Sequence, residues 1–88
     1  MGQHQIESVT NLTVRQIGLT AMQVTQRNVD VKADSNIGED LGIDSLTLMN
    51  IVMGLEDVFE LSIPLDRLAD VETVGDLAAL IDELRARN

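Results

Sequence analysis

The segment Asp44-Ser45-Leu46, within Asp40–Leu46, contains the residues best suited to carry chemistry in this chain. Asp44 is a favourable N-cap residue and an apolar-periodic pattern begins directly after it, so a helix is expected to start at Ser45. A serine hydroxyl in the first turn of a helix can be exposed while its backbone is held rigid. A phosphodiester placed there would meet unpaired N–H groups and the positive end of the helix dipole. The segment therefore predicts an attachment point for a phosphate-linked prosthetic group.

The helix that starts at Ser45 is expected to run to about Glu60, and helical periodicity divides it into three faces. The face predicted to enter the core holds Leu48, Ile51, Val52, Leu55, Val58 and Phe59. The face predicted to point away from it holds Thr47, Asn50, Gly54 and Asp57. The third face is an edge that Ser45 shares with Met49, Met53, Glu56 and Glu60. Two flexible apolar side chains and two carboxylates therefore follow the serine along one line.

A first helix and a long loop are expected to precede the serine. The helix should extend from about Thr10 to Arg27, with an apolar stripe formed by Val14, Ile17, Ala21 and Val24. The loop over Asn28–Ile43 is rich in Asp, Asn, Ser and Gly. Its segment Asp30–Asp34 invites comparison with a calcium-binding hand, which places oxygen ligands at alternate positions. Lys32 at the third position and Leu41 in place of the final glutamate argue against such a site.

The C-terminal part should contain a short element and a final helix. Pro64 stops helical continuation, so Leu65–Asp70 can form only a turn or a single-turn helix. The last helix is expected to start at Thr73, with Asp76 in capping-box spacing. The predicted core of the whole domain consists of Ile17, Val24, Val31, Ile37, Leu48, Ile51, Leu55, Phe59, Ile63, Leu68, Val74, Leu77, Ile81 and Leu84.

Length and composition indicate one small helical domain. The chain has 88 residues, so residues 1–88 are expected to form a single domain, with residues 1–6 as a loose leader that contains the only histidine, His4. Apolar residues make up 44% of the chain and Phe59 is the only aromatic, which favours a core of packed helices. The expected fold class is all-α, a four-helix bundle with a short third helix and a long loop between the first two helices. Met1 and the lack of a linker tail favour a free-standing protein.

Charge and missing residue types exclude several function classes. The formal net charge of -9 disfavours nucleic acid and anionic membranes, and it favours partners that present Lys and Arg. The absence of cysteine excludes disulfides and thiolate metal sites, so any thiol must be added to the chain. With one histidine and no glycine-rich phosphate loop, neither an enzyme nor a metal site is expected. No apolar run approaches the roughly 20 residues that are needed to span a bilayer, and the N-terminus lacks a secretion signal. The sequence therefore predicts a soluble, cytoplasmic monomer without membrane insertion.

An ordered set of motifs covers the region from Ile37 to about Leu84. It consists of Asp-Leu-Gly-x-Asp-Ser-Leu at Asp40–Leu46, the amphipathic helix after it, Ile63-Pro64, and Thr-Val-Gly-Asp at Thr73–Asp76. In this set and its spacings the chain resembles the acyl carrier protein family, which consists of phosphopantetheine-binding carrier domains.

The resemblance implies a post-translational modification of Ser45. A phosphopantetheinyl transferase would join 4'-phosphopantetheine from coenzyme A to its hydroxyl, and the terminal thiol of the arm would carry acyl groups as thioesters. This accords with the absence of cysteine, because the attached arm would supply the thiol. Asp44 and Leu46 belong to the modification motif of the family. The helix positions read by the transferase and by partner enzymes are matched here by Met49, Met53, Glu56 and Glu60.

The partners implied by the resemblance are acyl-loading, condensing or acyltransferase enzymes with basic docking patches, in biosynthesis of the fatty-acid, lipid or polyketide type. The sequence departs from the housekeeping fatty-acid pattern at four positions. Thr47, Asn50 and Val58 stand where those carriers often have acidic residues, and Arg67 adds a positive charge to the short third helix. A docking surface with fewer carboxylates should attract generic basic partners less, which favours a specialised pathway.

Two alternatives stay open from the residues alone. Serine at a helix start is often only a capping residue, although Asp44 can already serve in that role. The chain could then be an unmodified acidic docking module with a bare Ser45. Within the carrier class, the cargo could instead be a polyketide, an aryl group or an aminoacyl (peptidyl) group. Neither charge nor periodicity decides between these cargoes.

Overall fold

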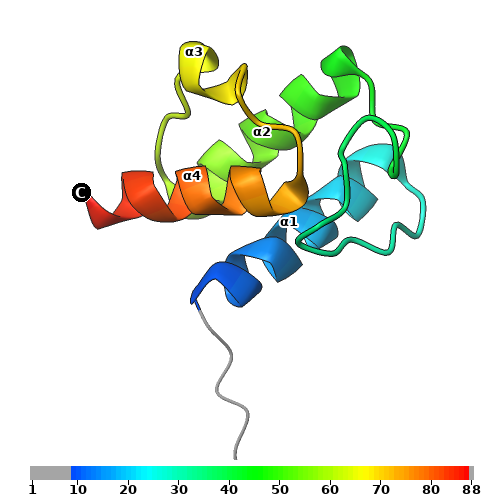
Figure 1. Cartoon of the computed structure of the whole chain (residues 1–88), viewed down its shortest axis with the longest axis horizontal. Coiled ribbons are helices and arrows are strands. Elements are labelled where there is room, and N and C mark those ends of the chain that lie inside the picture. Colours follow the sequence, from blue (N-terminus) through cyan, green and yellow to red (C-terminus); the bar gives the residue numbers. More distant parts are fainter. Residues whose placement is uncertain (1–8, 88) are drawn as a thin grey trace, which may run out of the picture.

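The structure is a computed structural model that describes residues 9–87. Within this range four helices follow one another, named α1 (Val9–Thr25), α2 (Ser45–Phe59), α3 (Leu65–Leu68) and α4 (Val74–Ala86) (Figure 1). The predicted all-α fold with a short third helix and a long loop after α1 is confirmed. The predicted leader over residues 1–6, including His4, lies outside the described residues. Among the described helices, none combines the length and the apolar character that crossing a bilayer requires.

The core lies between α1, α2 and α4, with α1 packed against both of the others (Figure 1). The predicted core residues that are buried are Ile17, Ile37, Ile51, Leu55, Ile63, Leu68, Val74, Leu77 and Ile81. Those that are only half-buried, at the margin of the core, are Val24, Val31, Leu48, Phe59 and Leu84. Ile43, Ala78 and Leu80 are also buried and were not predicted. Leu80 is buried in addition to the predicted core residues Val74, Leu77 and Ile81, so the buried arc of α4 is wider than the prediction.

Two residues of α2 contradict the predicted faces. Val58, predicted to enter the core, is 50% exposed. Gly54, predicted to point away from the core, faces α1 instead, because a Cβ atom added to it would lie 2.9 Å from Cγ2 of Thr20. The missing side chain at Gly54 therefore lets α1 and α2 approach closely at this point, whereas one turn later α1 leaves Val58 uncovered.

The long loop between α1 and α2 is fastened to the start of α4, beside which it runs in Figure 1. The N–H of Ile37 donates to the carbonyl of Glu72 at 2.9 Å, and the N–H of Gly75 donates to the carbonyl of Ala33 at 2.7 Å. A Cβ atom at residue 75 would lie 2.8 Å from that same carbonyl oxygen, so the approach requires glycine. The loop thereby satisfies a backbone donor in the first turn of α4 that would otherwise lack a partner.

Local capping defines the ends of α2 and α4. The predicted capping box at the start of α4 is confirmed, because Thr73 Oγ1 accepts from the N–H of Asp76 and Asp76 Oδ2 accepts from the N–H of Thr73. At the end of α2, Glu60 adopts a left-handed conformation with φ 56° and its N–H donates to the carbonyl of Glu56. The chain therefore leaves α2 directly after Phe59.

Candidate functional site

Ser45 is the first residue of α2, and its side chain is exposed. Two neighbours hold the backbone on its N-terminal side. Ile43 is buried in the core, and its N–H donates to the carbonyl of Ile37 at 3.2 Å. Asp44 is the N-cap, as predicted, and its Oδ1 accepts from the N–H of Thr47 at 2.8 Å. The hydroxyl of Ser45 is therefore presented to solvent from a fixed backbone.

The Asp44 carboxylate caps α2 and makes its hydrogen bond to Thr47 rather than to Ser45. The hydrogen bond from Thr47 lowers the pKa of Asp44 below its ordinary value, because it stabilises the charged form. Asp44 consequently stays ionised at neutral pH and caps the helix. This arrangement leaves Ser45 free of the capping role that would have explained it structurally.

A hollow of about 250 Å³ opens beside the serine. Its lining comes from the long loop, from the start of α2 and from the segment before α4, and consists of Asn36, Ile37, Gly38, Ile43, Asp44, Ser45, Leu48, Val71 and Glu72. The loop wall is braced by side chains, because Asp40 Oδ2 accepts from the N–H of Asn36 at 2.7 Å and Asn36 Oδ1 accepts from the N–H of Glu39 at 2.8 Å. The sequence predicted the serine but not this hollow, because its walls come from segments far apart in the chain.

The hollow is lined by carboxylates and by apolar or uncharged polar side chains. None of its lining residues is a histidine, lysine or arginine that could activate or stabilise a nucleophile. The only carboxylate adjacent to Ser45 in sequence is Asp44, which is engaged by Thr47. The described residues also contain no cluster of three or more His, Cys, Asp or Glu side chains arranged to hold a metal ion.

The residues of the predicted edge of α2 differ in their exposure. Met53 is 60% exposed, whereas Met49 is half-buried against the core. Leu46, the motif residue after Ser45, is 73% exposed. Glu60, at the end of the helix, is exposed. Glu56 is half-buried, and its Oε2 accepts from the N–H of Ile63 at 2.7 Å, so this carboxylate fixes the segment that leads into α3.

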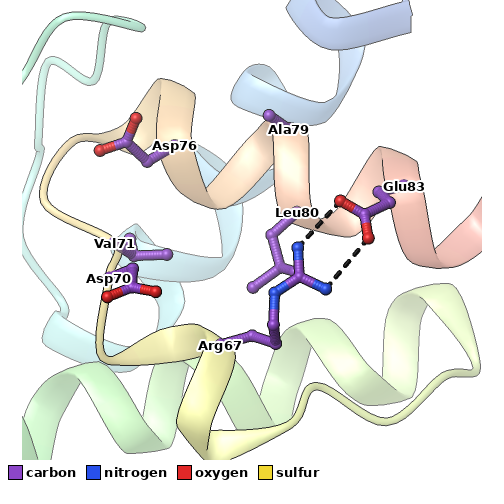
Figure 2. A pocket seen from close by; sticks show the side chains of 7 residues that line it. All are labelled: Arg67, Asp70, Val71, Asp76, Ala79, Leu80 and Glu83. Carbon is purple, nitrogen blue, oxygen red and sulfur yellow. Dashed lines mark hydrogen bonds and ion pairs between the residues drawn. The ribbon is translucent and has the colours of Figure 1, made fainter.

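Arg67 does not act as a separate positive charge on α3. Its guanidinium forms two hydrogen bonds with the carboxylate of Glu83 on α4, at 3.0 and 2.9 Å (Figure 2). The pair raises the pKa of Arg67 and lowers the pKa of Glu83, since each charge stabilises the other. The side chains are separated by 16 residues in sequence, so helical periodicity gives no signal for this contact.

Comparisons with known proteins point to one family. The sequence family described as "Phosphopantetheine attachment site" matches residues 15–81. A probable acyl carrier protein of Caulobacter vibrioides is 58% identical over 83 residues, which cover 94% of this chain and 96% of that protein. An acyl carrier protein of Prochlorococcus marinus is 38% identical over 64 residues, covering 73% of this chain and 80% of that protein. A solved structure, a putative acyl carrier protein from Mycobacterium tuberculosis, matches with a TM-score of 0.74 at 27% identity, covering 81% of this chain and 96% of that one.

Proposed function

This chain belongs to the acyl carrier proteins, and we propose that Ser45 is the residue on which it carries 4'-phosphopantetheine. Members of the family are carriers rather than enzymes, bear this group covalently, and work with a phosphopantetheinyl transferase and with acyl-handling enzymes. The observation that carries the assignment is the exposed hydroxyl of Ser45 at the first residue of α2, beside a hollow open to solvent. The cargo we propose is an acyl intermediate, delivered to enzymes of fatty-acid, lipid or polyketide-type biosynthesis.

The residues around Ser45 suit this group. When bound, the group supplies a thiol on a flexible tether, which exchanges acyl groups as thioesters. Its phosphodiester charge would lie at the N-terminus of α2, where the helix dipole favours an anion by roughly 0.3 to 1 kcal/mol at an exposed site. Ile43 and Asp44 fix the backbone from which the tether starts, and the apolar side chains of Leu48 and Val71 line the adjoining hollow. The chain thus contributes a rigid base and a sheltered surface for a moving arm.

Intact mass tests the attachment directly. Incubation of the protein with coenzyme A and a promiscuous transferase should add the mass of one phosphopantetheine unit, and Ser45→Ala should abolish the gain. Ser62→Ala is the matched control, because Ser62 is also an exposed serine but lies outside any helix. A protein that gains no mass would instead be an unmodified acidic docking module. A gain that persists in Ser45→Ala would place the attachment elsewhere.

The edge of α2 is the surface we propose for docking the transferase and the partner enzymes. Any enzyme that reaches Ser45 must approach Leu46, the next residue, and Met53 continues the same edge two turns later. Glu60 adds an exposed carboxylate for basic docking patches, and Met49 supports the edge from its half-buried position. Glu56 contributes mainly through its hydrogen bond to Ile63, which holds the neighbouring segment in place.

Transferase kinetics test this surface. Met53→Ala should lower kcat/KM for modification of Ser45 by roughly five- to tenfold, the effect expected when a central apolar contact is truncated. Val58→Ala is the control, because Val58 is also an exposed apolar residue of α2 but lies outside the edge shared with Ser45. Equal effects of the two substitutions would remove the reason to place docking on the edge. Parallel loading with acyl, aryl and aminoacyl groups would then identify the cargo.

A further inference from the structure

An apolar groove that also carries positive charge lies between α1 and the C-terminal ends of α2 and α4. Its volume is about 350 Å³. Leu12, Arg15 and Leu19 line it from α1, Phe59 lines it from α2, and Arg85 lines it from α4. Among the residues that the structure describes, no aspartate or glutamate lines this groove. Its charge is therefore opposite to that of the whole chain, which has a net charge of -9.

The α1 wall of the groove has an apolar face that the core does not use. Leu12 and Leu19 are each 50% exposed, and their spacing places them on one face of α1 about two helical turns apart. Single exposed leucines are normal on a protein surface, but these two border one groove beside the half-buried Phe59. The chain has 15 Asp and Glu residues, yet none of them is in α1. This face of α1 thus lacks the carboxylates that cover the rest of the protein.

The α4 wall supplies a cation in a defined position. The guanidinium carbon of Arg85 lies 5.0 Å from the centre of the Phe59 ring. The ring positions this cation but carries no charge that could neutralise it. The neighbouring carboxylate of Asp82 accepts a hydrogen bond from the buried Thr13 at 2.6 Å, so it takes part in the contact between α1 and α4. A carboxylate that entered the groove could therefore pair with Arg85.

The groove is remote from the serine. Ser45 is the first residue of α2 and Phe59 is the last, so the 15-residue helix separates them by about 21 Å. Figure 1 shows the ends of α2 and α4 on the left and the start of α2 on the right. A protein bound in the groove would leave Ser45 and the exposed Leu46 accessible.

We propose that this groove is a second docking surface, and that it binds an acidic amphipathic helix of a partner protein. Apolar side chains two turns apart on that helix would contact Leu12 and Leu19 when the helix lies along α1. Carboxylates at its edges would pair with Arg15 and Arg85. The net charge of -9 disfavours a second copy of this chain and an anionic membrane as occupants. The groove and the edge of α2 thus select partners of opposite charge.

A synthetic peptide can test the groove in the unmodified protein, independently of Ser45. The probe is a helical peptide of about 18 residues with leucines at i, i+4 and i+7, flanked by glutamates. A companion peptide has lysine in place of each glutamate. The acidic peptide should shift the methyl resonances of Leu12 and Leu19, and the basic peptide should leave them unchanged. Equal shifts with both peptides, or none with the acidic peptide at millimolar concentration, would overturn the proposal.

Substitutions identify the surface that binds the acidic peptide. Leu19→Ala and Arg85→Glu should each weaken its binding about five- to tenfold, because each removes a contact at the groove. Leu65→Ala is the control for the leucine, since Leu65 is 66% exposed but lies on α3, outside the groove. Arg27→Glu is the control for the charge, because it changes the net charge equally at an exposed residue that does not line the groove. Losses as large in the two controls would overturn the assignment to the groove.

Three observations would assign the groove to a different occupant and so overturn the proposal. Methyl resonances of Leu12 and Leu19 that move with protein concentration alone would indicate a second copy of the chain. Decanoate that shifts the same resonances and displaces the acidic peptide would indicate a small anionic amphiphile. Resonances that move in Ile6→Ala without any peptide would indicate the N-terminal segment of this chain. If none of the three occurs, an acidic partner helix remains the occupant.

Simultaneous use of both surfaces rests on the proposed function, because it requires modification of Ser45. A transferase should modify Ser45 at the same rate with and without a saturating amount of the acidic peptide. The same measurement on Leu19→Ala detects any direct effect of the peptide on the transferase. Slower modification of the native protein alone would overturn simultaneous docking. A protein that is not modified even without the peptide overturns the attachment to Ser45 and not the groove.

Discussion

The close approach of α1 and α2 at Gly54 provides a sharp test of the packing that positions Ser45. In Gly54→Ala, the new Cβ atom would lie 2.9 Å from Cγ2 of Thr20, which is too close for two carbon atoms. Thr20 is buried and β-branched, so its methyl group has little freedom to move away. Relieving the overlap must therefore shift the two helices relative to each other.

Two opposing effects determine how much Gly54→Ala changes the free energy of unfolding. Overpacking of a buried contact typically costs about 1 to 3 kcal/mol. Alanine stabilises a helix interior by about 1 kcal/mol relative to glycine. Gly54→Ala should therefore destabilise the protein by about 0 to 2 kcal/mol. In a Thr20→Ser background the methyl group is gone, so the same substitution should stabilise the protein by up to about 1 kcal/mol. Serine at position 20 keeps a hydroxyl that can accept from Gln16, as Thr20 does at 3.3 Å.

The assay is urea unfolding of the four proteins of this double-mutant cycle, followed by far-UV circular dichroism. The expected coupling between positions 20 and 54 is about 1 to 3 kcal/mol, provided that the m-values agree. If Gly54→Ala stabilised the native and the Thr20→Ser proteins equally, the coupling would vanish. The two helices would then not approach closely at this point, and the packing described for α2 would be wrong.

Three further outcomes are expected. Leu55→Ala should lower the free energy of unfolding by about 2 to 5 kcal/mol, because Leu55 is 0% exposed, and unchanged urea unfolding would contradict the assigned core face of α2. Thr73→Ala should lower it by about 0.5 to 2 kcal/mol by removing the capping box of α4, and the loss should appear as earlier thermal unfolding. Acid should destabilise the protein, because the folded state lowers the pKa values of Asp44, Asp76 and Glu83 below their ordinary values of 3.8, 3.8 and 4.5. Their contribution is present above about pH 4.5 and is lost as the pH falls through the lowered values, so a urea midpoint that does not fall in that range would contradict these contacts.

Features that depend on neighbours in sequence were predictable. The N-cap at Asp44 and the capping box from Thr73 to Asp76 each join residues three apart, so their spacing is visible in the chain. Pro64 is the N-cap residue of α3, and the short element predicted after it begins at Leu65. The start of α2 at Ser45, and hence the candidate attachment residue, follows from the same local rules.

Features that depend on how the helices pack against one another were not predictable. Val58 was assigned to the core face of α2 and Gly54 to the face that points away from the core, yet the apolar residue is exposed and the glycine is packed against α1. Periodicity groups residues into faces, but only the position of α1 decides which part of the helix surface is covered. Leu80 was missed for a similar reason, because the core residues predicted on α4 cover a narrower arc than the surface that its neighbours bury.

The sequence by itself therefore determined the helices, their caps, and the serine that α2 presents at its first residue, because hydrogen bonds within a turn and a repeating apolar pattern act over a few residues. The tertiary structure alone decided the hollow beside Ser45, the bond from Gly75 to Ala33, and the pairing of Arg67 with Glu83. These contacts join residues many positions apart, and they form only after the burial of apolar side chains has brought the helices together.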